Sequence, residues 1–291
     1  MADITVFILT YNEQLHIERC IRSIKSFAKG IVLIDSFSTD ATEQIAINAG
    51  CTVVRHAFTN HAEQFNWGLD NIPIITEWVM RLDADEYVRP ELAAEIESRL
   101  SGLPADVAGV KLKRRVIFMG RWMRHGGYYP IELLRLFRRG KARSEQRLMD
   151  EHIRITEGRT VTFEHDIVDE NLNDLTWWTA KHNHYATREA QDLFELRQRP
   201  SENPHFVATN AQAERKRWLK EKVYARLPIA LRPLLYFLYR YVFLLGFLDG
   251  REGMIWHTLQ GFWYRFLVDA KLVERDRGEA APQGSRKIVS Q

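Results

Sequence analysis

Residues 78–86 read Trp78-Val79-Met80-Arg81-Leu82-Asp83-Ala84-Asp85-Glu86, a mainly apolar run that ends abruptly in carboxylates. Such a run is typical of a strand buried on both faces of a parallel sheet. In open parallel sheets, ligands bind beyond the carboxyl ends of the strands. Asp83 and Asp85 stand at that end, where two carboxylates can share one Mg²⁺ ion with substrate phosphates. Acidic pairs with this spacing are also common on solvated surfaces, so it is their position that favours a metal site.

Strands and helices alternate through the first hundred residues. Strands are predicted at 4–9, 31–34, 51–54 and 78–82, and helices at 17–24, 40–48, 61–69 and 90–100. This alternation predicts an α/β fold, a mostly parallel, Rossmann-like sheet with helices on both faces. Strand-like runs continue at 107–112, 132–137 and 160–163. Glycines interrupt them and indicate loops around a site: Gly120, Gly126, Gly127 and Gly140.

The chain is predicted to divide into a catalytic domain at 1–170, a helical region at 171–278 and a disordered tail at 279–291. A length of 291 residues accommodates one such domain and an appendage. The net charge of +3 is too small to favour nucleic acid as a partner. Cys20 and Cys51 are read as core thiols, which suits a reducing compartment. The N-terminus does not resemble a signal peptide, so we expect folding to begin in the cytoplasm.

Polar residues follow the first two predicted strands as well. Thr10-Tyr11-Asn12-Glu13 follows the first strand, and residues 35–40 follow the second. Asp35, at the strand end itself, is placed to accept hydrogen bonds from a base or a ribose, whereas Asp40 also suits the N-cap of the next helix. Two polar residues near the start of the third helix either contact the same ligand or face solvent: Gln64 and Asn66.

These motifs, in this order, resemble those of family-2 glycosyltransferases with the GT-A fold. The resemblance covers residues 3–165 and starts with three segments: Thr10-Tyr11-Asn12-Glu13, residues 32–40 and Asp83-Ala84-Asp85-Glu86. The later segments are similar to a bacterial subgroup that adds sugars to lipopolysaccharide core, O-antigen or other surface polysaccharides. They are Phe118-Met119-Gly120-Arg121-Trp122, His125-Gly126-Gly127, Arg135-Leu136-Phe137-Arg138-Arg139 and Asp150-Glu151-His152.

The resemblance implies a role for each matching position. The uridine part of a UDP-sugar donor would be held by Thr10, Tyr11, Glu13, Asp35 and Asp40. Asp83 would face the ribose and pyrophosphate, Asp85 would bind Mg²⁺ or Mn²⁺, and His152 would reach the metal or the pyrophosphate. The general base would be Asp150 or Glu151; the alternative is a structural ion pair with Arg147 or Arg154.

The side-chain chemistry agrees with these roles. A metal that bridges the two phosphates of UDP stabilises the charge of the leaving group. A sugar hydroxyl needs a carboxylate to accept its proton. One base without a second nucleophilic carboxylate predicts single displacement with inversion. Arg135, Arg138 and Arg139 offer guanidinium groups that match pyrophosphate, although Arg138 and Arg139 are equally consistent with solvated positions.

The sequence gives less information about the sugar that is transferred. From the resemblance, glucose is the first expectation for the transferred hexose, with galactose and N-acetylglucosamine close behind. The processive members of the family carry Gln-x-x-Arg-Trp, whereas this chain reads Gln212-Ala213-Glu214-Arg215-Lys216. That difference predicts the addition of one sugar per visit.

The C-terminal third predicts contact with an anionic membrane surface. Residues 212–226 hold six basic and two acidic residues, a net charge of +4, and an apolar run at 227–248 follows. Polar residues recur every four positions in each of two helical segments: Arg232, Tyr236 and Arg240, then His257, Gly261, Arg265 and Asp269. Amphipathic helices behind a basic segment predict a peripheral location at the cytoplasmic face of the inner membrane, near a lipid-linked saccharide acceptor. Packing against the catalytic domain or a second subunit is the alternative.

Two other functions are weighed against transfer of a sugar. A sugar nucleotidyltransferase would have the same acidic metal site, but we would expect a glycine-rich loop with Arg and Lys where Thr10–Glu13 stands. A non-catalytic membrane-associated scaffold with a transferase fold has no need of the carboxylates Asp83 and Asp85. Both alternatives therefore fit the sequence less well.

Overall fold

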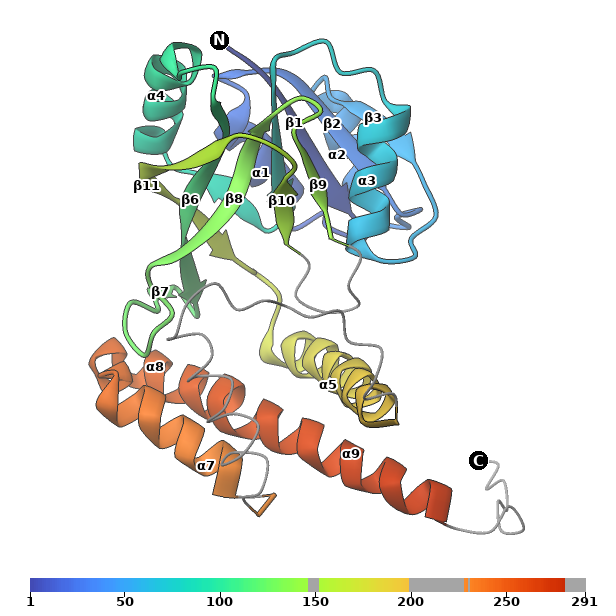
Figure 1. Cartoon of the computed structure of the whole chain (residues 1–291), viewed down its shortest axis with the longest axis vertical. Coiled ribbons are helices and arrows are strands. Elements are labelled where there is room, and N and C mark those ends of the chain that lie inside the picture. The colour runs from blue at the N-terminus through green and yellow to red at the C-terminus, as the bar shows by residue number, and fades with distance from the viewer. Residues whose placement is uncertain (146–151, 199–227, 230, 281–291) are drawn as a thin grey trace. The chain divides into compact units, whose positions relative to one another are not determined.

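The computed structural model describes residues 1–145, 152–198, 228–229 and 231–280 (Figure 1). The chain forms two compact units, Met1–Asn173 and Asp174–Gln291. The boundary between the units therefore follows residue 173, three residues after the boundary predicted from the sequence. Of the predicted tail, residues 279 and 280 end a helix, and 281–291 lie outside the described residues.

Nine of the described strands of the first unit form one sheet, and two more form a separate hairpin. The sheet has the order β3-β2-β1-β4-β8-β6-β11-β5, with β7 paired to β6. Its strands are β1 (Ala2–Thr10), β2 (Ala28–Asp35), β3 (Thr52–Arg55), β4 (Trp78–Asp83), β5 (Glu86–Val88), β6 (Val107–Phe118), β7 (Arg121–Trp122), β8 (Ile131–Arg138) and β11 (Arg159–Glu170). The hairpin consists of β9 (Ala142–Ser144) and β10 (Ile153–Ile155).

The parallel half of the sheet is as predicted. β3, β2, β1 and β4 run parallel, and the helices that connect them are α1 (Ile17–Ile24), α2 (Thr42–Asn48) and α3 (His61–Asn71). The N-cap of α2 is Ala41 rather than Asp40; the Asp40 carboxylate instead accepts the backbone N–H of Thr42 at 3.0 Å. This arrangement, continued by mixed strands, is the expected α/β fold of the GT-A type.

The second half of the sheet is mixed. β8 is antiparallel to both β4 and β6, whereas β11 is parallel to β6. β11 is much longer than the predicted run at 160–163 and continues through the polar residues Glu164-His165-Asp166 to Glu170. Gly120, Gly126, Gly127 and Gly140 all have positive φ, as the predicted loops require.

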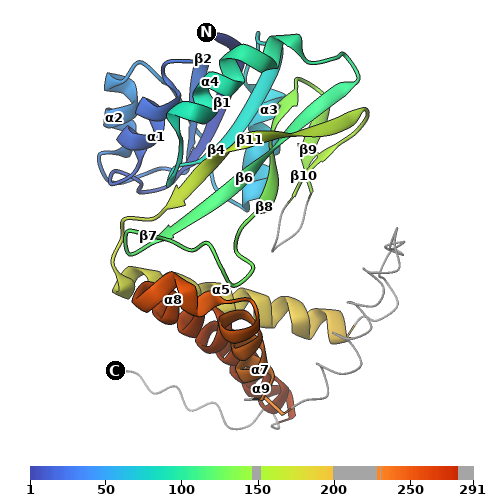
Figure 2. The same cartoon turned by 90° about the vertical axis from the view of Figure 1, so that its left-hand side faces the viewer.

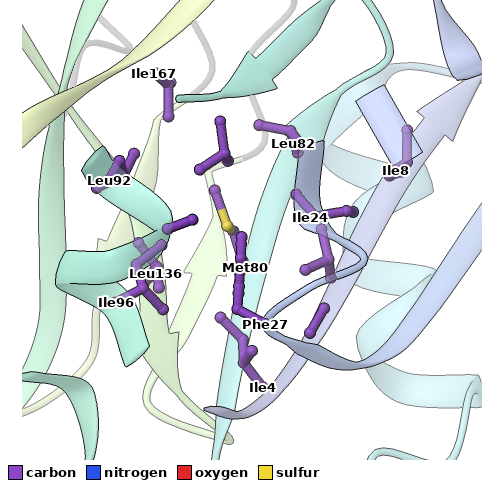
Figure 3. Packing of buried hydrophobic residues seen from close by; sticks show 14 of the residues in the cluster. Ile4, Ile8, Ile24, Phe27, Met80, Leu82, Leu92, Ile96, Leu136 and Ile167 are labelled. Atoms are coloured by element: carbon purple, nitrogen blue, oxygen red, sulfur yellow. The ribbon is translucent and has the colours of Figure 1, made fainter. Parts of the chain in front are cut away.

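Apolar side chains cover both faces of the sheet. α1 and α4 (Pro90–Arg99) pack on one face, and Figure 3 shows Met80 between Ile24 of α1 and Ile96 of α4. On the other face, Phe65 of α3 packs edge-on against Phe7 and Phe137. In Figure 2, which is viewed from the side of α1 and α4, these helices lie in front of the sheet and α3 lies behind it. The core thus fixes the strand ends that carry the polar residues.

The described part of the second unit is helical. It consists of α5 (Leu175–Gln198), α7 (Leu231–Leu238) with a π-helical turn at Tyr239–Phe243, a short 3₁₀ turn at Gly246–Asp249, α8 (Gly250–Trp256), a second π-helical segment at His257–Trp263, and α9 (Tyr264–Ala280). α5 and α9 pack through Ala186, Ala190, Tyr264 and Val268. The basic segment 212–226 lies outside the described residues.

None of the described helices is, by itself, long and apolar enough to cross a bilayer. Leu231–Phe243 and Gly246–Arg277 meet the length and composition criteria as a pair, with a bend of 73° between them.

Candidate active site

Three predicted site residues meet at the carboxyl edge of the parallel strands. The register pairs Thr10 of β1 with Asp35 of β2, and Leu9 of β1 with Asp83 of β4. The three polar side chains therefore end neighbouring strands. This is the edge at which ligands bind in open α/β sheets.

Asp35 organises the loop that follows β2. Its side chain is fully buried, and its carboxylate accepts hydrogen bonds from Thr10 Oγ1 at 2.8 Å, Ser38 N at 2.7 Å and Ser38 Oγ at 2.6 Å. Ser38 Oγ in turn accepts the backbone N–H of Asn12 at 2.9 Å. The two loops after β1 and β2 are thus joined, and Tyr11 is left 59% exposed on them.

Asp40 joins the same loops from the other side. Its carboxylate accepts hydrogen bonds from Thr42 Oγ1 at 2.5 Å and from the backbone N–H of Gln14 at 3.1 Å. Burial acts to raise the pKa of Asp40, but these hydrogen bonds outweigh it and leave the pKa below its usual value. Asp40 is therefore ionised at neutral pH and keeps the loops in place.

Glu13 belongs to a hydrogen-bonded chain that the sequence did not reveal. His16 is buried, and its Nε2 accepts the backbone N–H of Leu172 at 2.9 Å. The proton of the neutral ring is then on Nδ1, which donates to Glu13 Oε2 at 2.6 Å. The only signal in the sequence was the spacing of three between Glu13 and His16.

Gln64 and Asn66 both have protein partners. The Gln64 side chain is fully buried, with its amide bonded to His56 and to Ser36 Oγ. Asn66 exchanges two hydrogen bonds with the backbone of Ser144, at 2.9 and 3.0 Å. Gln64 therefore supports the loop after β2, and Asn66 ties α3 to β9. Contact of either residue with a UDP-sugar stays a prediction.

Arg135 lies within the acidic cluster after β4. Only 7% of Arg135 is exposed, and its guanidinium donates to Asp83 Oδ2 at 2.8 Å and to Glu86 Oε1 at 2.5 Å. Burial acts to raise the pKa of Asp83, but Arg135 and then Arg81 hold it well below its usual range. Burial, together with the charge of Asp83, raises the pKa of Glu86 to about 8 despite Arg135. Arg135 thus holds Asp83 and Glu86 together where negative charge is crowded.

Asp85 lies beside residues from the end of β11. Its Oδ2 accepts a hydrogen bond from Asn171 Nδ2 at 3.1 Å. Asp169, 3.5 Å from the Arg114 guanidinium, has its pKa raised to about 6 by burial and then by the charge of Asp85. Asp169 and Asn171 were missed because the polar residues 164–166 gave the impression that the strand had already ended.

The carboxylate oxygens of Asp83 and Asp85 at this edge are suitable ligands for a hard divalent cation. Carboxylate oxygens are the preferred ligands of Mg²⁺ and Mn²⁺, and one or two protein carboxylates suffice when phosphate oxygens complete the shell. The raised pKa values of Glu86 and Asp169 mark a place where negative charge is crowded. Among the residues that the structure describes, no cation pairs with the Asp85 carboxylate, which makes Asp85 the best-placed ligand.

The remaining predicted residues are not brought to this cluster. His152 is exposed and directly precedes β10, and within the described ranges no three His, Cys, Asp or Glu side chains could hold an ion together. Asp150 and Glu151 lie outside the described residues. Arg138 and Arg139 lie at the opposite edge, where Arg138 pairs with Glu77 and stacks over Trp78.

Two curated relatives of the chain are glycosyltransferases. Among curated relatives, an uncharacterized glycosyltransferase of Rickettsia typhi is 34% identical over 97 residues, so the match spans about a third of that protein (32%) and 33% of this chain. The lipopolysaccharide core biosynthesis glycosyltransferase LpsC of Rhizobium meliloti is 27% identical and matches along 96% of this chain and 95% of its own length.

A solved structure and a family model complete the comparison. Glucosyl-3-phosphoglycerate synthase from Mycobacterium tuberculosis, crystallised with Mn²⁺, UDP and glucosyl-3-phosphoglycerate, is 24% identical; the alignment covers 38% of this chain and 44% of that one, with a TM-score of 0.32. The model of glycosyl transferase family 2 matches residues 5–172, more than half of the chain. The chain therefore belongs to glycosyl transferase family 2.

Proposed function

We propose that this chain transfers a hexose, glucose first among the candidates, from a UDP-sugar to a hydroxyl of a lipid-linked glycan. The reaction is an inverting single displacement that adds one sugar per visit. The observation that carries the proposal is the convergence of Asp83 and Asp85 with the joined loops after β1 and β2, at one sheet edge of a family-2 chain.

The donor is held by residues at that edge. Thr10, Asp35 and Asp40 fix the loops after β1 and β2, on which Tyr11 and Glu13 face the uridine. Asp83, held in place by Arg135, faces the ribose and pyrophosphate. Fixed loops stabilise the bound donor because they need little further ordering on binding.

Asp85 would hold Mg²⁺ or Mn²⁺ at the pyrophosphate. The bound ion supplies positive charge that stabilises UDP as it leaves. Asn171 orients the Asp85 carboxylate through its hydrogen bond to Oδ2. The acceptor hydroxyl loses its proton to a carboxylate, for which Asp150 and Glu151 are the proposed residues.

The acceptor is proposed from the relative that matches almost the whole chain. LpsC is named for lipopolysaccharide core biosynthesis, which supports a bacterial surface glycan as the acceptor class. A lipid-linked acceptor implies that the enzyme works at the cytoplasmic face of the inner membrane as a peripheral protein.

Titration calorimetry with UDP and a panel of UDP-sugars, with and without Mn²⁺, tests the proposal. We expect Mn²⁺-dependent binding that Asp85→Ala weakens by at least about tenfold, because a metal ligand is lost. Asp106→Asn is the matched control, since Asp106 is an exposed acid just before β6, at the opposite edge of the sheet. Absence of UDP binding under every condition, or equal loss in both variants, would overturn the proposal.

A further inference from the structure

Helix α7 and the π-helical turn Tyr239–Phe243 that continues it have a large exposed apolar side. We call it the outer face of α7, formed by Leu231, Leu234, Leu235, Leu238, Val242 and Phe243. These side chains are between 37% and 74% exposed. Their spacing of three and four residues places them on one side of the helix. Contiguous apolar surface of this kind marks an interaction site.

The polar side chains of the same helix point the other way. Arg232 forms an ion pair with Asp269 of α9 at 3.1 Å, and both side chains are only 15% exposed. Arg240 donates to the Tyr236 hydroxyl at 2.5 Å. Arg265 of α9 also lies over the Tyr236 ring, 5.8 Å from its centroid, although its side chain is 42% exposed and pairs with Glu189 of α5. Polar side chains thus lie between the two helical segments while the apolar side chains lie outside, which is the reverse of a water-soluble helix pair.

The segments 231–243 and 257–280 form a helical hairpin, and buried polar residues and glycines pack the turn between them. His257 and Asp249 are 0% and 2% exposed. A Cβ on Gly246 would lie 2.3 Å from His257 Nε2, and one on Gly253 would lie 2.6 Å from the Asp249 Cβ. The turn is therefore closely packed, which fixes how the two helical segments lie against each other.

We propose that the outer face of α7 lies in the interface of an anionic bilayer leaflet, with its aliphatic side chains toward the acyl chains. The inference rests on the proposed function, because a lipid-linked acceptor would be presented in that leaflet. The exposed aromatic rings of Tyr239, Phe243 and Phe247 suit the headgroup level, where aromatic side chains concentrate.

Charge complementarity favours a lipid surface over a protein partner. Residues 212–226 precede the hairpin in the sequence and carry a net charge of +4, which anionic headgroups attract. Arg232 of α7 and Arg240 of the π-helical turn are engaged by Asp269 and Tyr236, so the outer face has no charged side chain of its own that a protein partner could pair with. An anionic membrane surface therefore complements both the positive charge of residues 212–226 and the apolar outer face of α7.

Co-sedimentation of the full chain with vesicles tests the inference. Phosphatidylglycerol–phosphatidylethanolamine vesicles are compared with pure phosphatidylcholine vesicles, at low and high salt. The variant Leu234→Gln/Leu238→Gln is compared with Ile47→Gln/Ile75→Gln, which changes two exposed apolar residues of the first unit. We expect the first variant to bind anionic vesicles at least about tenfold more weakly and the control to bind like the native chain.

The outcomes separate this inference from the proposed function. Native UDP binding in the Leu234→Gln/Leu238→Gln variant would show that its first unit is folded. Equal vesicle binding by the two variants, or no vesicle binding by the native chain, would overturn the inference while leaving UDP binding intact. A native chain that is dimeric by light scattering, becomes monomeric in the same variant and binds no vesicles would assign the face to a second copy instead. Vesicle binding without UDP binding would overturn the proposed function alone.

Discussion

Arg135 is the residue on which the acidic cluster depends. It is buried, and its guanidinium is shared between Asp83 and Glu86. Arg135 is buried, whereas the Asp83 side chain is 38% exposed, so water screens the carboxylate that a lost guanidinium would leave behind. We therefore expect Arg135→Met to lower the free energy of unfolding by about 1–3 kcal/mol, less than the cost of breaking a fully buried pair, in urea titrations followed by circular dichroism.

A second variant separates charge from packing at this position. Arg135→Met/Asp83→Asn removes both charges, so we expect it to be more stable than Arg135→Met alone. Equal stability of the two variants would mean that lost packing, rather than the bare Asp83 carboxylate, destabilises the protein.

His257 gives the second unit a pH dependence. Burial, and then Arg240, lower its pKa to about 4 although Asp249 opposes them. Between the unfolded pKa of about 6.5 and about 4, the unfolded chain binds a proton that the folded ring does not, so stability falls as pH falls through this window. We expect a slope of up to about 1.4 kcal/mol per pH unit from this group. His257→Gln should flatten the curve by that contribution; an unchanged slope would show that other groups cause it.

At the scale of the elements, glycines decide how closely the helical hairpin of the second unit packs. A Cβ on Gly246 would meet the His257 ring at 2.3 Å, whereas one on Gly261 would meet Phe237 Cα at an ordinary 3.6 Å. We therefore expect Gly246→Ala to destabilise the second unit by about 1–3 kcal/mol, because the ring must move. Gly261→Ala is the control and should cost little or even stabilise the helix by up to about 1 kcal/mol. Thermal unfolding followed by circular dichroism measures both; equal midpoints would show that the ring moves without cost.

The carboxyl edge of the sheet is also a property of elements. Thr10, Asp35 and Asp83 come together because β1, β2 and β4 are parallel and adjacent. Arg135 reaches the same edge from β8, which runs the opposite way. Because β8 is antiparallel to β4, its residues before Leu136 lie toward the carboxyl edge, whereas Arg138 at its end and the following Arg139 lie at the other edge.

At the scale of the whole molecule, the two units divide the proposed work. Each has its own apolar core, so a surface change in one should leave the other intact. We expect Asp85→Ala to bind anionic vesicles like the native chain, and Leu234→Gln/Leu238→Gln to bind UDP like the native chain. Calorimetry and co-sedimentation on both proteins check this; loss of both activities in either variant would contradict the division.

Much of the first unit could be predicted from the sequence because its signals are local. Apolar runs followed by helical periodicity predicted β1 to β4 and the helices between them, and the polar residues after β1, β2 and β4 predicted the ligand edge. These patterns depend on neighbours within a few residues. The end of β11 could not be found in this way, because Glu164-His165-Asp166 interrupts its apolar run, and only pairing with β6 and β5 shows that the strand continues.

The sequence by itself determined the family, the sheet edge and the two-sided helices near the C-terminus. Only the tertiary structure decided that Arg135 lies on Asp83 and Glu86, that His16 bonds Glu13 and Leu172, and that the polar sides of the C-terminal helices face each other. The physical reason is the same in each case. Helical periodicity separates a polar side from an apolar side, but which side faces protein depends on contacts between segments that are distant in the chain.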